Sequence, residues 1–202
     1  MIIGITGGTG CGKTTLLELI AQLGGLVLDC DAIYHGLVQT DTDMLRAIGV
    51  RFPGTVENGV LARKKLGSIV FSDPEALQAL NAITHAAVKR EVLRRLESAP
   101  QLAAIDAIGL FEGGLAPLCD VTVAVTAPVE QRLARLMARD GISRDYALAR
   151  IHAQRPQEEF VALCAYHLEN DGTKEAFQRK CIAFFRQTGI ITTEICEKET
   201  SL

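Results

Sequence analysis

The chain has 202 residues and a mass of 21.8 kDa, the size of one domain with some elaboration. Hydrophobic residues make up 48% of the sequence and charged residues 22%, which excludes a disordered tail protein. The formal net charge of −3 provides no overall basic field, so we expect no nucleic-acid partner. Any anionic substrate must therefore be bound by a local cluster of positive charge.

The cysteines indicate a reducing compartment, and we predict a cytoplasmic protein. The six cysteines are scattered and none forms a C-x-x-C pair, and the four histidines lack zinc-finger spacing. Structural zinc and a disulfide framework are therefore not expected. No apolar run of about 18 residues occurs, so we expect no contact with a membrane. The first predicted strand starts at Ile2, so we expect no signal peptide.

Short apolar runs alternate with helical patterns along the whole chain. The predicted strands are residues 2–6, 26–28, 102–105, 121–125 and 166–168. The predicted helices are residues 16–23, most of 32–98 with breaks near Phe52 and Asp73, 129–139, 144–155 and 174–186. This alternation predicts an α/β fold with a parallel sheet flanked by helices on both faces. The polar tail from Thr192 is expected to fray.

A glycine-rich stretch, Gly7 to Thr14, matches the nucleotide-phosphate loop G-x-x-x-x-G-K-[ST] between a predicted strand and a predicted helix. Its glycines let backbone N–H groups converge on phosphate oxygens, and the following helix adds its positive end. Lys13 supplies a charge for the outer phosphates, and the Thr14 hydroxyl suits Mg²⁺. The predicted ATP-binding residues are Gly8, Thr9, Gly10, Cys11, Gly12, Lys13, Thr14 and Thr15, and the predicted metal ligand is Thr14.

The phosphate loop alone does not select a reaction, because GTPases, motor ATPases and small-molecule kinases all use it. The sequence contains no N-K-x-D stretch, which a switch GTPase would need to read its base. The third predicted strand does not lead into the Asp-Glu pair typical of motor ATPases. A kinase for a small molecule therefore fits the sequence better.

Two acids, Asp29 and Asp31, follow the second predicted strand, at the edge where open parallel sheets bind ligands. Phosphorylation of an alcohol needs a group that orients the hydroxyl and accepts its proton. We assign this role to Asp31; the alternative is that Asp31 only caps the helix that begins near Ala32. Asp29 is either a structural partner or a ligand that reaches Mg²⁺ through water.

A run of six arginines forms the densest positive segment of the chain: Arg132, Arg135, Arg139, Arg144, Arg150 and Arg155. The first three share one helix face, separate from the apolar face that would pack. The run predicts a lid that closes over the transferred phosphoryl group and excludes water, with Gly141 as its hinge. The alternative is a solvated face paired with the acids Glu130, Asp140 and Asp145.

Together these motifs resemble the dephospho-coenzyme A kinase family over about residues 1 to 172, and the later ones are fairly specific. The matching stretches are G-I-T-G-G at 4–8 with Lys13 and Thr14, L-D-C-D at 28–31, L-A-R-K-K-L at 61–66, V-F at 70–71, N-A-I-T-H at 81–85, L-F-E at 110–112, Q-R-L at 131–133, R-D-G at 139–141 and R-I-H-A-Q at 150–154.

The resemblance implies one P-loop nucleotide-kinase domain over residues 1–202, with a helical substrate-binding insertion at about 32–98 and a helical lid at about 129–156. It implies that ATP, with Mg²⁺, phosphorylates the ribose 3′-hydroxyl of dephospho-coenzyme A, the last step of coenzyme A biosynthesis. We expect a monomer or a weak homo-oligomer. By position, the catalytic residues are Asp31, Lys13, Arg139 and Arg150. The residues implied to bind the acceptor are Asp31, Arg63, His85 and Glu112.

The chain departs from the family's usual pattern at Ala86, at Ile108 and Gly109, and over residues 164–170. The family usually has proline at the first two places and A-D-x-V-I-x-N at the third. These departures predict that the acceptor pocket differs from that of other family members. Two other interpretations stay open: a P-loop kinase for another nucleoside-like alcohol, and a nucleotide-binding regulatory module that closes without chemistry.

Overall fold

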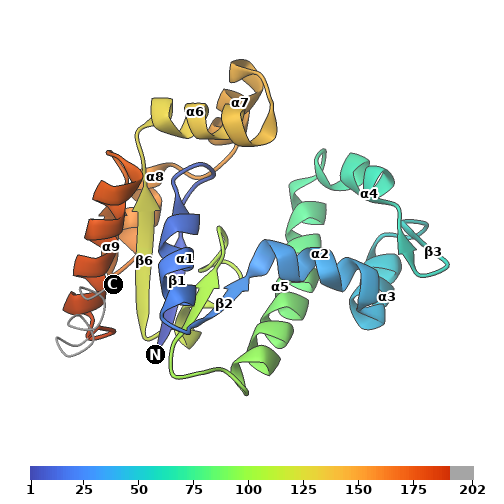
Figure 1. Ribbon diagram of the computed structural model, residues 1–202. Helices are drawn as coiled ribbons and strands as arrows, with labels where there is room; N and C mark the ends of the chain where they lie inside the picture. Colours follow the sequence, from blue (N-terminus) through green and yellow to red (C-terminus); the bar gives the residue numbers. More distant parts are fainter. Residues whose placement is uncertain (192–202) are drawn as a thin grey trace.

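A five-stranded parallel sheet forms the centre of the computed structural model, which describes residues 1–191 (Figure 1). Its strands are β1 (Ile2–Thr6), β2 (Leu26–Asp29), β5 (Ala103–Asp106), β6 (Val121–Thr126) and β7 (Tyr166–Glu169), in the order β2-β5-β1-β6-β7. Every neighbouring pair in this sheet runs parallel, as the sequence predicted. Because the earlier strands lie on one side of β1 and the later ones on the other, the carboxyl end of β1 is the switch point where open sheets bind ligands.

Helices cover both faces of this sheet and continue beyond its edge (Figure 1). They are α1 (Lys13–Gln22), α2 (Cys30–Thr40), α3 (Thr42–Arg51), α4 (Arg63–Val70), α5 (Pro74–Leu96), α6 (Val129–Asp140), α7 (Arg144–His152), α8 (Gln157–Leu163) and α9 (Lys174–Gln187), with a 3-10 turn at Ala116–Leu118. The helices α1 and α9 pack on one face, while α2 and α5 pack on the other.

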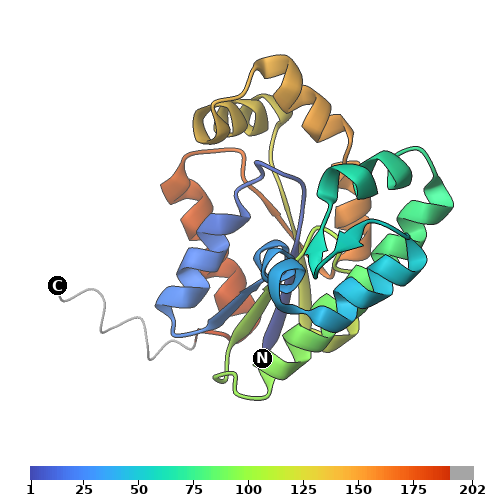
Figure 2. The same ribbon diagram turned by 90° about the vertical axis from the view of Figure 1, so that its right-hand side faces the viewer.

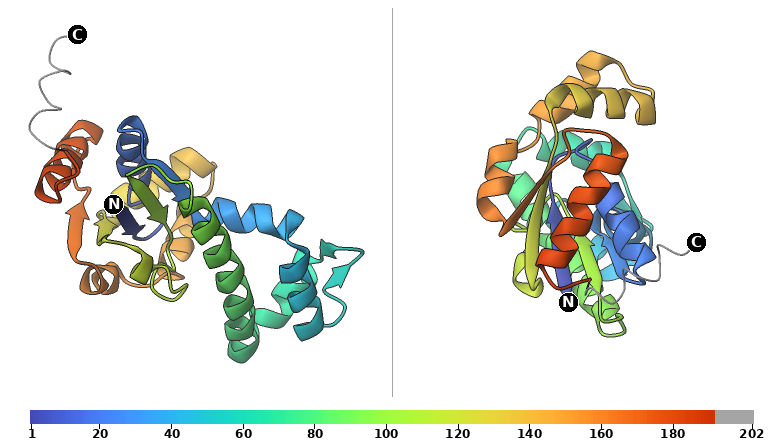
Figure 3. Two further views of the ribbon diagram at one scale, coloured as in Figure 1. Left: turned by 90° about the horizontal axis from the view of Figure 1, so that it is seen from below. Right: turned by 60° about the vertical axis from the view of Figure 1, so that its left-hand side comes forward.

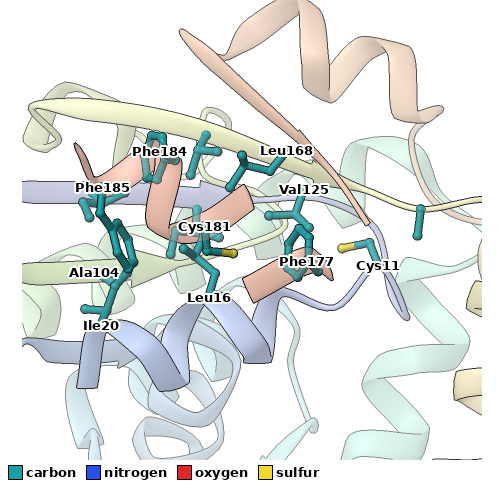
Figure 4. Close-up of a cluster of buried hydrophobic side chains, with 14 residues drawn as sticks. Cys11, Leu16, Ile20, Ala104, Val125, Leu168, Phe177, Cys181, Phe184 and Phe185 are labelled. Atoms are coloured by element: carbon teal, nitrogen blue, oxygen red, sulfur yellow. The ribbon is translucent and has the colours of Figure 1, made fainter. Parts of the chain in front are cut away.

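Neighbouring strand residues point to opposite faces, which divides the hydrophobic core into two layers. Ala104 of β5 lies in the layer beneath α1 and α9, with Phe177 and Phe185, whereas the next residue, Ile105, lies in the layer with Val92 of α5. Figure 4 shows the first layer, in which Cys11 of the phosphate loop reaches the cluster near Phe177. The loop is therefore attached to the core by one of its own side chains.

The segment from α2 to α5 extends from the sheet edge and has a hydrophobic cluster of its own, which includes Ile48 and Phe52 (Figures 2 and 3). The sequence predicted a mostly helical stretch here, and four helices are present. The structure adds an antiparallel hairpin of β3 (Val56–Glu57) and β4 (Val60–Leu61). Its turn residues Asn58 and Gly59 have φ of 51° and 77°, the conformation that favours an Asn-Gly pair in two-residue hairpins.

Helices α6 and α7 form a small helical hairpin above the phosphate loop (Figures 1 and 2). Leu133, Leu136 and Ile151 form its apolar seam. Gly141 ends α6 with φ of 64°, a left-handed conformation that a helix C-terminus commonly uses and glycine adopts most easily. The sequence predicted a helix as far as residue 155; in the structure α7 ends at His152, and the separate helix α8, which the sequence did not predict, follows.

No helix among residues 1–191 combines the length and apolar character needed to cross a lipid bilayer. The expected fraying of the tail from Thr192 lies outside the described residues.

The core predicts a clear contrast between two phenylalanines. Phe177 is 1% exposed beneath the sheet, so Phe177→Ala should lower the free energy of unfolding by about 3–5 kcal/mol. Phe71 is 86% exposed, so Phe71→Ala should change it by less than about 0.5 kcal/mol. Urea denaturation followed by circular dichroism measures both values. Equal effects of the two substitutions would contradict this assignment of the core.

Candidate active site

The phosphate loop connects β1 to α1 at the switch point of the sheet. Gly7, with φ of 138°, lies so near β6 that a Cβ atom there would be 2.1 Å from the Val125 carbonyl oxygen. Gly12, with φ of 97°, also has no room for a side chain, since a Cβ atom there would be 2.1 Å from Asn170 Nδ2. Glycine is therefore required at both positions, by backbone conformation and by space.

A cavity of about 720 Å³ lies between this loop, the carboxyl ends of β2 and β5, and the hairpin of α6 and α7. The loop lines it with residues 8–14, so Thr15 is the one predicted ATP-binding residue that does not line it. Cys11 is fully buried, although it is one of the residues that line the cavity.

Lys13 curls back along the loop and is mostly buried. Its Nζ donates a hydrogen bond to the Gly7 carbonyl oxygen at 2.9 Å and lies 3.9 Å from Asp106 Oδ1. Burial raises the pKa of Asp106 to about 6; Lys13 opposes this shift, and the charges of Asp29 and Asp31 add to it. Asp106 Oδ1 is buried and has no hydrogen-bond partner within residues 1–191. An acceptor atom of this kind is suited to a cation or a water that arrives with the nucleotide.

Asp29 and Asp106 come near each other because β2 and β5 are adjacent and parallel, which sets Asp29 directly opposite Asp106. The Asp29 side chain caps α2 by accepting a hydrogen bond from the Ala32 N–H at 2.9 Å. The alternative that Asp31 is the cap is therefore wrong, because the cap is Asp29. Asp31 lies in the first turn of α2, exposed, and lines the cavity.

A second cavity, of about 280 Å³, opens beside Asp31 toward α5. Asp31 and Ile108 line both cavities, and His85 lines the second. Glu112 approaches the same place, since its Oε2 and His85 Nε2 lie 3.8 and 3.9 Å from where a Gly109 Cβ would be. Glu112 also pairs with Arg155. Two of the departures from the family pattern, Ile108 and Gly109, are thus part of the wall of this cavity.

Arg63 is not in contact with either cavity. It lies at the start of α4 and lines a separate groove of about 180 Å³. This groove shares Tyr34 and Leu80 with the cavity beside Asp31, so it continues that cavity outward along the helical segment.

The arginines of the run differ in what they contact. Arg139 and Arg150 line the larger cavity and both pair with Asp140, which accepts hydrogen bonds of 2.6 Å from Arg139 Nε and from Arg150 Nη1. Arg139 and then Arg150 lower the pKa of Asp140 to about 2. Arg132 is buried, and Arg135 is half-buried; both donate to carbonyl oxygens of the phosphate loop. Arg144 pairs with Glu130 on the surface, which agrees, for this residue, with the alternative of a solvated face.

Several site residues were not found from the sequence. Asp106 had a local signal, because an apolar strand that ends in an acid beside the phosphate-loop strand often faces the phosphates. No local sequence signal indicates which residues Gln154 and Asn170 contact. Gln154 Oε1 accepts a hydrogen bond from the Thr9 N–H at 2.8 Å, and Asn170 Nδ2 donates to the Cys11 carbonyl oxygen at 2.9 Å. These contacts join residues more than a hundred positions apart.

The fold and the two adjoining cavities define a P-loop kinase for small molecules. A shikimate kinase structure from Acinetobacter baumannii has the same fold, with a TM-score of 0.52 and 19% identity over 93% of each chain. A dephospho-CoA kinase structure from Campylobacter jejuni overlays better, with a TM-score of 0.65 and 24% identity, covering 94% of this chain and 98% of its own. A crystal structure from Thermus thermophilus has a TM-score of 0.77 and 38% identity, covering 93% of this chain and 97% of its own.

Sequence comparison identifies the family. The family model for dephospho-CoA kinase matches residues 1–176. A dephospho-CoA kinase of Thermus thermophilus is 42% identical over 182 residues, which are 89% of this chain and 87% of that protein. One from Carboxydothermus hydrogenoformans is 35% identical over 192 residues, 92% and 93% of the two chains. This chain belongs to the dephospho-CoA kinase family, a family of transferases, which confirms the resemblance of its motifs.

The raised pKa of Asp106 predicts a pH effect on stability. Because the pKa rises from 3.8 to about 6 on folding, the folded protein favours the neutral acid, and this contribution is lost as pH rises through about 6. Without nucleotide or metal, the free energy of unfolding of the wild type should fall between about pH 4 and pH 7 relative to Asp106→Asn, by up to about 3 kcal/mol.

Denaturant titrations in chelator at several pH values measure this difference. Comparison with Asp106→Asn cancels the other titrating groups. Parallel pH profiles for the two proteins would mean that Asp106 titrates in the folded protein as it does in the unfolded chain.

Proposed function

We propose that this protein transfers the γ-phosphoryl group of ATP to the ribose 3′-hydroxyl of dephospho-CoA, the last step of coenzyme A biosynthesis. Membership of the family supports this proposal. The observation that carries it is the position of Asp31, a residue that lines both the phosphate-loop cavity and the cavity beside α5. A hydroxyl bound in the second cavity would meet a phosphoryl group bound in the first at this carboxylate.

In this proposal Asp31 orients the hydroxyl and accepts its proton as the new P–O bond forms. Asp31 is exposed and is not the helix cap, so its carboxylate is free to turn toward a substrate. The acceptor oxygen attacks the γ-phosphorus, the bond to the β-phosphate oxygen breaks, and ADP leaves with that electron pair. The residues of the chain supply position and charge for this transfer, not covalent chemistry.

The phosphates lie among positive charges in this proposal. Lys13 and backbone N–H groups of the loop from Gly10 onward take the β- and γ-phosphates. Arg139 and Arg150 line the same cavity, and both guanidinium groups pair with Asp140, which keeps them near that cavity. Helices α6 and α7 act as a lid that stabilises the charge on the transferred group and excludes water.

The residues around Lys13 fit Mg²⁺, the cation proposed to accompany ATP. The donors are oxygens, which Mg²⁺ prefers: the exposed Thr14 hydroxyl, the orphaned Asp106 Oδ1 and the Asp29 carboxylate. Within residues 1–191 no three His, Cys, Asp or Glu side chains are grouped to hold a metal alone. This agrees with an ion held mainly by phosphates and water. When bound, Mg²⁺ neutralises charge on the phosphates.

The acceptor takes the cavity beside α5 and the groove that continues it. His85 and Glu112 lie near the reacting hydroxyl, and Arg63 lies farther along the groove, where it can pair with an anionic part of the acceptor. Dephospho-CoA has the extended shape and the diphosphate that this arrangement suits.

The remaining expectations concern the setting of the enzyme. A monomer suffices, because every residue proposed for the site belongs to one chain. A reducing compartment such as the cytoplasm fits the cysteines, since all five within residues 1–191 are free.

Incubation with ATP, Mg²⁺ and dephospho-CoA should yield ADP and coenzyme A in equal amounts. Mass spectrometry identifies the product, and phosphatase mapping identifies the phosphorylated hydroxyl. Lys13→Ala should reduce turnover by about 10²-fold or more, because the outer phosphates lose their buried charge. Faster transfer to another nucleoside-like alcohol would favour that alternative. ATP binding without transfer to any of these acceptors would favour a regulatory module.

Asp31→Asn should lower kcat by about 10²–10⁴-fold while the affinity for ATP stays near that of the wild type, because an amide cannot accept the proton. Steady-state kinetics and nucleotide titration measure the two effects. Asp31→Ala should lose activity similarly with an unchanged melting temperature, since Asp29 caps α2. Near-normal kcat in Asp31→Asn, combined with lost stability in Asp31→Ala, would remove Asp31 from the reaction.

A further inference from the structure

Successive carbonyl oxygens of the phosphate loop are held from outside the loop. Arg132 Nε donates to the Thr9 oxygen at 2.9 Å, and Arg135 Nη1 donates to the Gly10 and Cys11 oxygens at 3.2 and 3.3 Å. Asn170 Nδ2 also donates to the Cys11 oxygen, at 2.9 Å. The loop backbone is thus bound by side chains of α6 and of the residue that follows β7.

The contact at Thr9 involves both polar groups of that residue. Its carbonyl oxygen accepts from Arg132 Nε, and its N–H donates to Gln154 Oε1 at 2.8 Å. Arg132 Nη2 reaches the same Gln154 oxygen at 3.3 Å, which closes the network. The network joins α6 and the segment after α7 to a single residue of the loop.

Arg132 differs from the other arginines of the segment in its burial. It is 3% exposed and has no carboxylate partner within residues 1–191. Burial lowers the pKa of its guanidinium, which expresses the cost of a charge taken out of water. A Cβ at Gly8 would lie 2.4 Å from Arg132 Nη2, so the loop packs directly on this charge.

Two consequences follow from this geometry. A trans peptide unit directs its N–H away from its C=O, so a Thr9 oxygen held by Arg132 fixes the opposite direction of the Gly10 N–H. The anion-binding N–H groups are then oriented before the nucleotide arrives. A buried cation without a counter-charge also attracts an anion, and the nearest place for one is the phosphate cavity on the loop.

We propose that Arg132, assisted by Gln154, is a positioning residue that holds the phosphate loop in its anion-binding shape and adds uncompensated positive charge against it. Arg132 does not line the cavity, so it acts through the loop and does not contact the substrate. The inference rests on the proposed use of this loop for the phosphates of ATP. It is independent of the identity of the acceptor.

The direct test uses binding of inorganic tripolyphosphate and of ATP, measured by calorimetry in the absence of acceptor. Arg132→Met removes charge and hydrogen bonds, and both ligands should bind about 10- to 100-fold more weakly. Arg132→Gln retains a donor, and Arg132→Lys retains the charge, so each should recover part of the loss. Arg144→Gln is the matched control, because Arg144 is an exposed arginine of the same segment that pairs with Glu130 at the surface; it should bind like the wild type.

Two further readouts separate positioning from general damage to the fold. The Thr9 amide should exchange its hydrogen faster in Arg132→Met and Arg132→Lys than in Arg144→Gln, while the melting temperatures of properly folded variants stay comparable. In turnover assays the KM for ATP should rise more than kcat falls, because an ordered loop contributes to binding in both the ground state and the transition state.

Wild-type tripolyphosphate affinity in both Arg132→Gln and Arg132→Lys, or in Arg132→Met if it folds, would overturn the proposal. An unchanged Thr9 exchange rate in these variants would do the same. Failure of the wild type itself to bind tripolyphosphate and ATP would instead reject the phosphate site of the proposed function. Failure to phosphorylate dephospho-CoA, with these binding differences intact, would affect the acceptor alone.

Discussion

The close packing of the phosphate loop is the constraint on which the rest of the site depends. Gly7 lies against the backbone of β6 and Gly12 against Asn170, with no room for a side chain at either place. Cys11 anchors the same loop in the core beneath α9. A loop fixed on three sides presents its N–H groups without having to be ordered by the substrate, so less of the nucleotide's binding energy is spent on ordering it.

Charge is distributed around that loop in a pattern that a nucleotide would complete. On the sheet side, Asp29 and Asp106 end adjacent strands and Asp31 lies in the first turn of α2. The charges of Asp29 and Asp31 contribute to the raised pKa of Asp106. On the other side, arginines of α6 and α7 approach the loop. Bound phosphates would compensate the positive charge of the arginines, and a bound divalent cation would compensate the negative charge of the carboxylates. Because the nucleotide phosphates and the cation also attract each other, this arrangement favours their binding together.

How much the sequence predicted depends on how local the determining interactions are. The phosphate loop, the parallel sheet and the helices α6 and α9 follow from short patterns, so they were predicted. The β3–β4 hairpin also had a local signal in Asn58 and Gly59, which a helical expectation for the whole segment concealed. In contrast, Arg132 and Gln154 take their roles from contacts with Thr9, more than a hundred residues away. The spacing along α6 predicted that Arg132 and Arg139 share one face, but it did not predict which of the two would be buried.

The meeting of the two cavities at Asp31 separates the common chemistry from the choice of acceptor. The phosphate cavity is built from the loop and strand ends, which are held by the sheet. The second cavity is built mainly from α2, α5 and the loop after β5, and α2 and α5 also pack in the separate hydrophobic cluster of residues such as Ile48. A change at Gly109, which lines only the second cavity, would therefore reshape the acceptor side without altering the wall of the phosphate cavity. Whatever the acceptor, its hydroxyl would still have to lie beside Asp31, because Asp31 borders both cavities.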